Sequence, residues 1–224
     1  MGRKVALNIL EHLPSLSFFQ MAKGCNILLL RDDFHYKHHF YHNRSRILTK
    51  SGPKWIEVIV QVPRYNTPIN QVKTGGNWKQ SYQKRITRAY ANHPHFKSQM
   101  PLIDKVLDLH SIKLGDYNYY FMKQLAKWLK LPYKIKRVTG TEDIDIAERG
   151  FKIKEVLRYY NTKQLIVTPR ESNYLRVGNE ISIEIGCQSP STYPQKGQAQ
   201  FIGNLSIIDT LMNIGADKTR KLIT

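Results

Sequence analysis

The chain lacks the features that mark secreted and membrane proteins. It has no apolar run approaching the roughly 18 residues of a membrane span, and no short apolar stretch with a cleavage site at its N-terminus. Its two cysteines, Cys25 and Cys187, stand far apart, which excludes a disulfide framework and a cysteine zinc site. We therefore expect a cytoplasmic protein with buried thiols.

Common catalytic signatures are also missing. The sequence contains no GxGxxG, GxxxxGK[ST], HExxH or GxSxG motif, which argues against common dinucleotide enzymes, P-loop NTPases, zincins and serine hydrolases. The stretch "TGGN" (74–77) has two interpretations: a phosphate cradle at the start of a helix, or an ordinary turn. We expect no cofactor.

Acidic residues are scarce in one long region. The formal net charge is +18, and between Phe34 and Ile103 the only acidic residue is Glu57, whereas acidic residues cluster at 141–148. Such a region creates a positive field that concentrates nucleic acid, nucleotide-linked substrates or an anionic membrane surface. The alternative is that the charge serves solubility alone.

The hydrophobic patterning predicts a single α/β domain over residues 1–224, with a mixed β-sheet flanked by helices. Strands are expected at 4–10, 26–33, 133–140, 163–169 and 180–186, with a hairpin at 46–62. Helices are expected at 13–23, 77–96, 101–111, 116–131 and 147–161, and a last one from Asn204 as N-cap to Gly215 as the residue after its end.

The stretch "HYKHHFYHNR" (35–44) holds four histidines: His35, His38, His39 and His42. On a helix they would share one face and could bind a metal ion, but a strand would divide them between two faces. Because the stretch follows a strand and is rich in aromatic residues, we predict a basic loop and no metal site.

A polar face is expected on the last helix. Ser206, Asp209 and Asn213 fall on one side of it, opposite an apolar stripe. Asp209 can project into a cleft beside Gln195 and act as a base or hold a substrate amine. The alternative is an ordinary capping and solvent-facing side.

Several motifs, in order along the chain, resemble the WbqC-like family. They are "NILEHLPSLSFF" (8–19), "DDFHYKHHFYHNRSRI" (32–47), "WIEVIV" (55–60), "NWKQSYQKRITRAYANHPHF" (77–96), "YPQ" (193–195) and "NLSIIDTLMNIGAD" (204–217). The resemblance runs from about residue 4 to 217. The chain departs from it at the family's His-Gln-Pro, where Asn8, Ile9 and Leu10 stand, and His12 replaces the following tyrosine.

The resemblance implies a transferase of surface-polysaccharide (O-antigen) biosynthesis that moves an acyl or aminoacyl group, such as glycyl, onto an amino-sugar nucleotide. The implied partners are an anionic nucleotide sugar or an aminoacyl-tRNA. The implied catalytic residues are Asp209, with His35 and Asp33 as lesser candidates, and the implied substrate-binding residues are Arg44, Asn43, Tyr36, Lys37, Tyr193, Gln195 and Ser206.

Alternatives to this function stay open. Arg44 can bind phosphate as a bidentate clamp, or form a structural ion pair with Asp32 or Asp33. The chain can also be a basic nucleic-acid-binding protein without catalysis, or an inactive member of the family that retains the fold. If the family's histidine is catalytic, either this chain has lost it, or His12 or His35 substitutes for it.

Overall fold

The computed structural model describes residues 3–140, 153–168, 172, 181–186 and 191–224. Its strands are β1 (Lys4–Ile9), β2 (Ile27–Arg31), β3 (Arg44–Thr49), β4 (Gly52–Glu57), β5 (Lys134–Arg137), β6 (Gln164–Val167) and β7 (Ser182–Ile185). Its helices are α1 (Leu16–Met21), α2 (Trp78–Tyr90), α3 (Phe96–Leu107), α4 (Leu114–Trp128), α5 (Ile153–Tyr159) and α7 (Ile207–Ile223), with 3₁₀ turns η1 (Ile69–Gln71) and η2 (Val138–Gly140). The predicted α/β class is confirmed.

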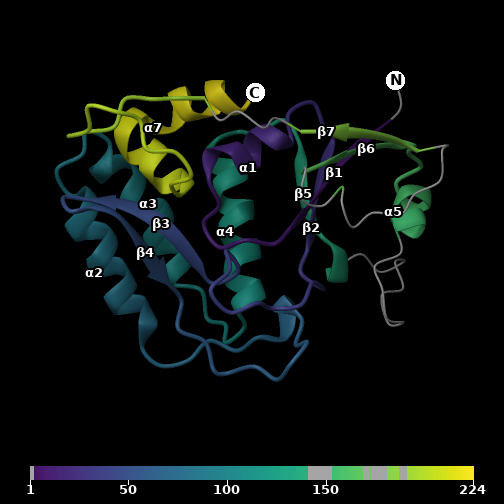
Figure 1. The fold of residues 1–224 in the computed structure, drawn as a ribbon, viewed down its shortest axis with the longest axis horizontal. Helices are drawn as coiled ribbons and strands as arrows, with labels where there is room; N and C mark the ends of the chain where they lie inside the picture. Colours follow the sequence, from purple (N-terminus) through teal and green to yellow (C-terminus); the bar gives the residue numbers. More distant parts are fainter. Residues whose placement is uncertain (1–2, 141–152, 169–171, 173–180, 187–190) are drawn as a thin grey trace.

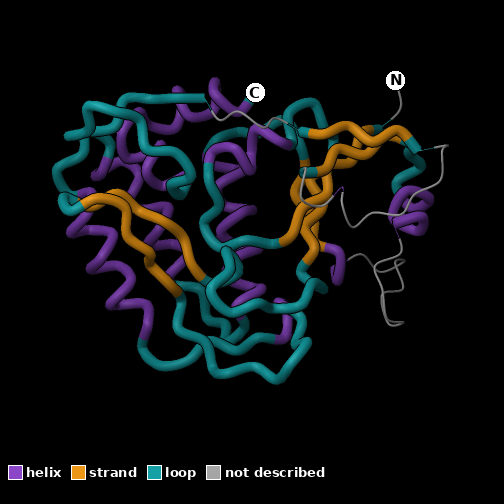
Figure 2. The backbone as a smooth tube through the Cα atoms, viewed as in Figure 1, coloured by secondary structure: helices purple, strands orange, loops and turns teal. Residues whose placement is uncertain are grey.

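Parallel and antiparallel pairing lie in separate sheets. Five strands form a parallel sheet in the order β5-β2-β1-β6-β7, and the expected hairpin forms a second sheet from β3 and β4. Figure 2 shows the two sheets apart, with helices between them. The central strands are continuous apolar runs because both faces of a parallel sheet are covered.

Side chains of the parallel sheet alternate between two cores. Ala6 and Leu28 face the larger core, which includes residues of α1, α2, α3, α4 and α7. Val5 and Leu29 face a smaller core with α5 on the opposite side of the sheet. In Figure 1, α4 stands between the hairpin and the parallel sheet. None of the helices in the described ranges is long and apolar enough to cross a lipid bilayer.

Most expected elements are present with shifted ends. Helix α2 buries one stripe of side chains at helical spacing, formed by Trp78, Tyr82, Ile86 and Tyr90. The last helix differs more: its N-cap is Ser206, not Asn204, and it continues to Ile223. Gly215 interrupts that helix at φ 77°, ψ 172°, so the helix breaks at the expected residue, but the chain then resumes helical geometry.

Some predictions concern residues outside the described ranges. These are Cys187, the acidic cluster at 141–148, the first part of the helix expected at 147–161, and the outer ends of the strands expected at 163–169 and 180–186. Cys25 is buried, as predicted. Burial raises the pKa of its thiol to about 12, so the thiol stays protonated at neutral pH.

Candidate functional site

The carboxyl ends of β2 and β5 bring polar side chains together. Leu30 of β2 pairs with Arg137 of β5, and Asp32 follows β2 directly. In open α/β sheets, ligands bind beyond the carboxyl ends of the strands. A ligand-binding site is therefore expected at this edge of the sheet.

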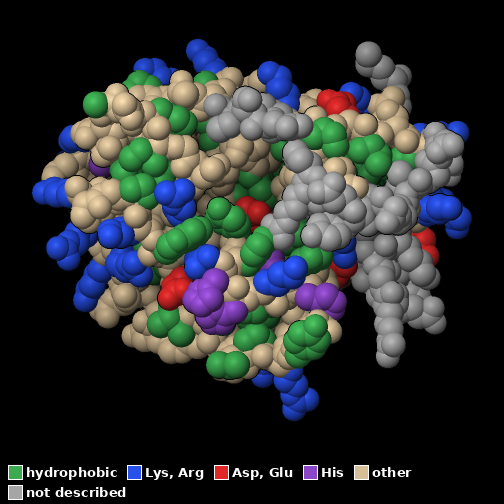
Figure 3. Space-filling view, viewed as in Figure 1, with side chains coloured by type: hydrophobic (Ala, Val, Ile, Leu, Met, Phe, Trp, Pro, Cys, Tyr) green, Lys and Arg blue, Asp and Glu red, His purple; other side chains and the backbone are tan. Residues whose placement is uncertain are grey.

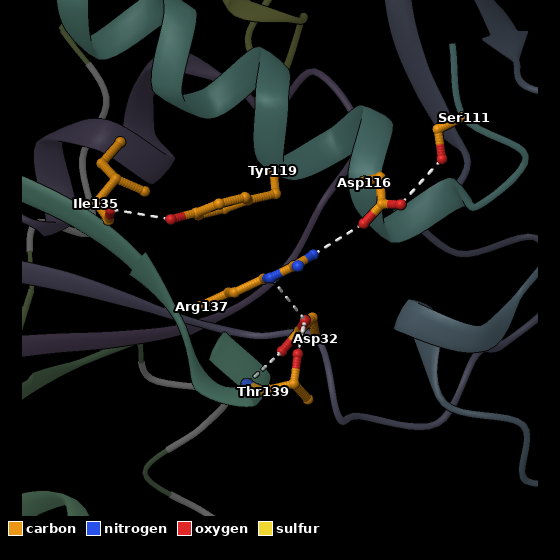
Figure 4. Close-up of polar contacts among 7 residues, drawn as sticks. All are labelled: Asp32, Ser111, Asp116, Tyr119, Ile135, Arg137 and Thr139. Atoms are coloured by element: carbon orange, nitrogen blue, oxygen red, sulfur yellow. Dashed lines mark hydrogen bonds and ion pairs between the residues drawn. The ribbon is translucent and has the colours of Figure 1, made fainter. Parts of the chain in front are cut away.

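Arg137 lies between two carboxylates at this edge (Figure 4). Its Nη1 donates to Oδ1 of Asp116 at 2.9 Å, and its Nε lies 3.9 Å from Oδ2 of Asp32. The guanidinium also lies over the ring of Tyr119, 5.1 Å from its centroid. These contacts fix the orientation of the Asp116 carboxylate.

Asp32 is the buried end of this network. Its side chain is fully buried, and its carboxylate accepts hydrogen bonds from the backbone N–H (3.1 Å) and the hydroxyl of Thr139. Burial raises the pKa of Asp32, and the Thr139 hydrogen bonds and the charge of Arg137 offset part of that rise. Asp32 thus anchors Arg137 from the protein side.

Asp116 also lines a cleft of about 720 Å³, a volume suited to a small ligand. The cleft is lined by Thr74, Gly76, Asn77, Trp78, Lys79, His110, Ser111, Ile112, Lys113, Asp116 and Tyr117. The second oxygen of Asp116 accepts a hydrogen bond from the Ser111 hydroxyl at 2.9 Å. With a side chain 36% exposed, Asp116 is accessible from the cleft.

Positive charge and two helix N-termini gather in the same cleft. Helices α2 and α4 both begin there, and neither Asn77 nor Lys113 at their N-cap positions makes a side-chain capping bond. Lys79 lies over the ring of Tyr117 and donates to Leu109 O at 2.8 Å. Two uncapped helix starts, Lys79 and Lys113 together favour an anion.

The residues predicted near the C-terminus do come together. Oδ1 of Asp209 accepts from the Tyr90 hydroxyl at 3.0 Å, and Oδ2 accepts from the Tyr193 hydroxyl at 2.8 Å and from Gln195 Nε2 at 3.2 Å. Asp209 is fully buried, and Ser206 caps the same helix. Burial raises the pKa of Asp209, and the hydrogen bonds from Tyr193, Tyr90 and Gln195 oppose that rise. The hydrogen-bond positions expected for a substrate are thus occupied by the protein itself.

The predicted residues of the 36–44 stretch form a second group with open polar atoms. The Tyr36 hydroxyl, Asn43 Oδ1 and Arg44 Nε are buried and have no hydrogen-bond partner within the described ranges. Arg44 stacks on the Trp55 ring at 4.2 Å and donates to His39 O. Burial raises the pKa of Tyr36 to about 12, so its hydroxyl is a donor at neutral pH. Polar atoms of this kind are positions for water or a ligand.

Hydrogen bonds to the backbone connect this second group to the cleft. Asn43 Nδ2 donates to Val58 O at 3.0 Å, and the next residue, Ile59, accepts from the backbone N–H of Gly75 at 2.8 Å. Gly76 is the following residue and lines the cleft. Lys37 belongs to the same loop and lies 5.7 Å from the ring centroid of Phe34.

Asp33 and His35 lie in the loop after β2. Asp33 pairs with Arg31 at 2.8 Å, and His35 Nδ1 lies 2.9 Å from Asn66 O. The alternative ion pair of Arg44 with Asp32 or Asp33 is not formed among the described residues, since Asp33 pairs with Arg31 and Asp32 with Arg137. His42 is fully buried among aromatic rings, whereas His38 and His39 stack on one another near the surface. Across the described ranges, no three His, Cys, Asp or Glu side chains form a metal-binding group.

His12 is buried and neutral. Asn118 Nδ2 donates to His42 O, so Asn118 Oδ1 faces His12 and accepts from its Nδ1–H at 2.8 Å. His12 Nε2 then accepts from the Tyr82 hydroxyl at 2.7 Å. Burial lowers the pKa of His12 to about 4, against a smaller opposing effect of the Asn118 hydrogen bond. These two hydrogen bonds connect His12 to α4 and to α2. Both ring nitrogens are therefore occupied, and neither is available to a substrate.

Sequence reasoning missed Arg137, and it used Asp116 only as the first residue of the helix expected at 116–131. The available signal was position along the strands: Arg137 ends β5 and Asp32 directly follows β2, and the carboxyl ends of neighbouring parallel strands meet at one edge of a sheet. Using that signal requires knowing that β5 pairs with β2, which the order of elements along the chain does not give.

Comparison with known proteins supports the resemblance seen in the motifs. The chain is 23% identical over 223 residues to the uncharacterized protein Rv1507c of Mycobacterium tuberculosis, which covers 96% of this chain and 95% of that protein. No solved structure matches. The sequence pattern of the WbqC-like protein family matches residues 11–221. The chain therefore belongs to the WbqC-like protein family.

Proposed function

We propose that the protein is a transferase that moves an acyl or aminoacyl group, such as glycyl, onto the amine of a nucleotide-linked amino sugar. One observation carries the proposal: the cleft beside α2 and α4 combines an anion-favouring side with a carboxylate. A nucleotide-linked amino sugar has the matching pair of groups, a diphosphate and an amine.

The diphosphate is assigned to the side formed by the starts of α2 and α4. Lys113 is exposed there and takes part in no ion pair within the described ranges. Backbone N–H groups of the first turn of α2 add donors that need no further charge, whereas at the start of α4 the N–H of Leu114 already donates to Val72 O and that of Lys113 to Ser111 Oγ. The amine is assigned to Asp116, whose carboxylate Arg137 and Ser111 hold in place.

The reaction requires an activated acyl donor, which we take to be an ester such as an aminoacyl-tRNA. The sugar nitrogen attacks the ester carbonyl carbon, so a C–N bond forms and the C–O bond of the ester breaks. Asp116 accepts the proton that the nitrogen loses, and the departing ribose oxygen takes up a proton. The buried, unpartnered donors of Tyr36 and Arg44 are assigned to the donor molecule, which requires that side chains of the 36–44 stretch move to admit it.

We propose a structural role for the predicted site residues near the C-terminus, which are Asp209, Tyr193, Gln195 and Ser206. Because Asp209 is buried and hydrogen-bonded on both oxygens, its contribution is to hold the C-terminal helix against α2. A direct catalytic role for Asp209 requires that a substrate displace Tyr193 or Gln195 from it.

Isothermal titration with nucleotide diphosphate sugars tests the proposal. We expect saturable binding of sugars that carry a free amine, and weaker binding of the matching hydroxyl sugars. Lys113→Ala should raise Kd roughly 10-fold, since it removes one charged contact to phosphate. Lys105→Ala on the exposed surface of α3 is the matched control and should leave Kd unchanged.

Asp116→Asn tests the amine assignment. It should remove the preference for the amine over the hydroxyl sugar while leaving binding of the free nucleotide diphosphate intact. Steep salt-dependent binding of oligonucleotides, with no saturable binding of any nucleotide sugar, would contradict the transferase proposal and support the nucleic-acid-binding alternative.

A further inference from the structure

A loop between β4 and η1 holds apolar side chains in solvent. Val62 is 98% exposed and Tyr65 is 94% exposed, and Arg64 between them is also exposed. Single exposed apolar residues are common on protein surfaces. Two apolar side chains that are almost fully exposed at the same loop tip are less common and call for an explanation.

The tip is held out by hydrogen bonds on both sides. On the side that enters the loop, Gln61 N donates to Lys73 O at 2.9 Å. On the side that leaves it, the N–H and hydroxyl of Thr67 donate to Arg64 O, and Tyr36 N donates to Thr67 O at 2.8 Å. These bonds keep the loop from folding its apolar side chains back onto the protein.

The surroundings of the tip are apolar and basic. Ile59, 52% exposed, lies on a segment paired with residues 73–75, which places it near the exposed Lys73. Glu57 is the only acidic residue between Phe34 and Ile103. In Figure 1 the connection from β4 to α2 runs along the lower edge of the molecule. Figure 3 shows apolar, basic and histidine side chains at that edge, with few carboxylates.

We propose that this edge docks the protein on an anionic phospholipid surface. Val62 and Tyr65 enter the interfacial region of the bilayer, and Arg64 and Lys73 contact headgroup phosphates. Tyrosine favours this region because its ring is apolar and its hydroxyl is polar. Basic residues beside an inserted apolar group add an attraction that salt weakens.

The side chains favour lipid over nucleic acid as the partner. Single-stranded nucleic acids bind by stacking bases on aromatic or guanidinium planes. Tyr65 and Arg64 do offer such planes, but the most exposed side chain at the tip, Val62, is aliphatic, as is the half-exposed Ile59, and aliphatic side chains contribute to insertion into lipid and not to base stacking. The docking surface uses none of the cleft residues, so this inference stands or falls separately from the proposed transferase activity.

Cosedimentation with vesicles tests the inference on the full chain. Phosphatidylcholine vesicles with phosphatidylglycerol should bind the protein, and vesicles of phosphatidylcholine alone should bind it much more weakly. The double variant Val62→Ser, Tyr65→Ser should lower the partition coefficient roughly 10-fold. Arg64→Ala with Lys73→Ala should lower it by a similar factor and flatten its dependence on salt.

A matched double variant elsewhere separates this surface from general hydrophobicity. Ile185→Ser with Tyr159→Ser also removes one aliphatic residue and one tyrosine, each 40% exposed, and should leave vesicle binding unchanged. Equal losses in both double variants would overturn the proposal, as would absence of binding to anionic vesicles at low salt. Binding of single-stranded RNA that is lost in the Val62, Tyr65 variant, without vesicle binding, would assign the surface to nucleic acid instead.

Discussion

Protonation of His12 is expected to destabilise the protein at mildly acidic pH. The side chain is fully buried between Asn118 and Tyr82, and burial lowers its pKa to about 4. In the unfolded chain the same imidazole has a pKa of about 6.5. As the pH falls from about 6.5 toward 4, His12 binds a proton in the unfolded chain but not in the folded protein. The free energy of unfolding therefore decreases over this pH range.

The two pKa values set the size of the effect. A difference of about 2.5 pKa units corresponds to about 3 kcal/mol when the pH lies well below both values. Between pH 7 and pH 5 the expected loss of unfolding free energy from this one residue is about 2 kcal/mol. Such a loss is a large fraction of the stability of a typical domain.

Urea unfolding of the wild type and of His12→Gln, at pH 7 and pH 5, measures this term. Glutamine offers one donor and one acceptor in place of the ring nitrogens, but it does not titrate. Asp32 and Asp209 have raised pKa values, so they favour the folded state as the pH falls, opposite to His12. Both carboxyls are present in both proteins, so their effect cancels in the difference.

The predicted result is a change with pH in the difference between the unfolding free energies of the wild type and of His12→Gln. The stability advantage of the wild type over His12→Gln should shrink by about 2 kcal/mol between pH 7 and pH 5. His110→Gln, which replaces an exposed histidine, is the matched control for loss of a histidine outside the core. An advantage of His12 that is equal at both pH values would refute the buried, neutral state of this histidine.

Two further substitutions probe the C-terminal helix. Asp209→Asn places an amide where three hydrogen-bond donors converge, and should lower the free energy of unfolding in urea by about 2 to 3 kcal/mol. The control Asp217→Asn, at an exposed position of the same helix, should lower it by less than about 0.5 kcal/mol. Equal losses in the two variants would contradict a structural role of Asp209. Gly215→Ala should lower the melting temperature more than Gly24→Ala: both glycines have a positive φ, but an added Cβ at Gly215 would lie 2.8 Å from His95 Nδ1, whereas Gly24 has open space. Similar shifts for both would show that His95 moves aside.

Local patterns predicted the elements better than the site. The stripe of α2 and the parallel strands follow from spacing and apolar runs, which act over a few residues. The polar side of the last helix was identified correctly, but its surroundings were not. Because Tyr90 lies 119 residues before Asp209 in the chain, no local pattern shows that this side is buried.

The cleft illustrates the same limit. The sequence predicts Asp116 as the first residue of a helix, whereas α4 begins at Leu114 and the Asp116 carboxylate accepts a hydrogen bond from Arg137. That contact depends on β5 lying beside β2 and on α4 crossing the sheet. Both are properties of the assembled fold, which is why Arg137 was not identified in advance.

The order of strands in the parallel sheet also governs when the fold can be completed during synthesis. Strand β1 is central, and Lys4 near the N-terminus pairs with Gln164 of β6. One hydrogen-bonding edge of β1 therefore stays unpaired on the ribosome until most of the chain has emerged. An open apolar strand edge invites association with other chains, and pairing between distant segments is slow. Nascent chains of this protein should consequently depend on chaperones, and fragments that end before β6 should aggregate.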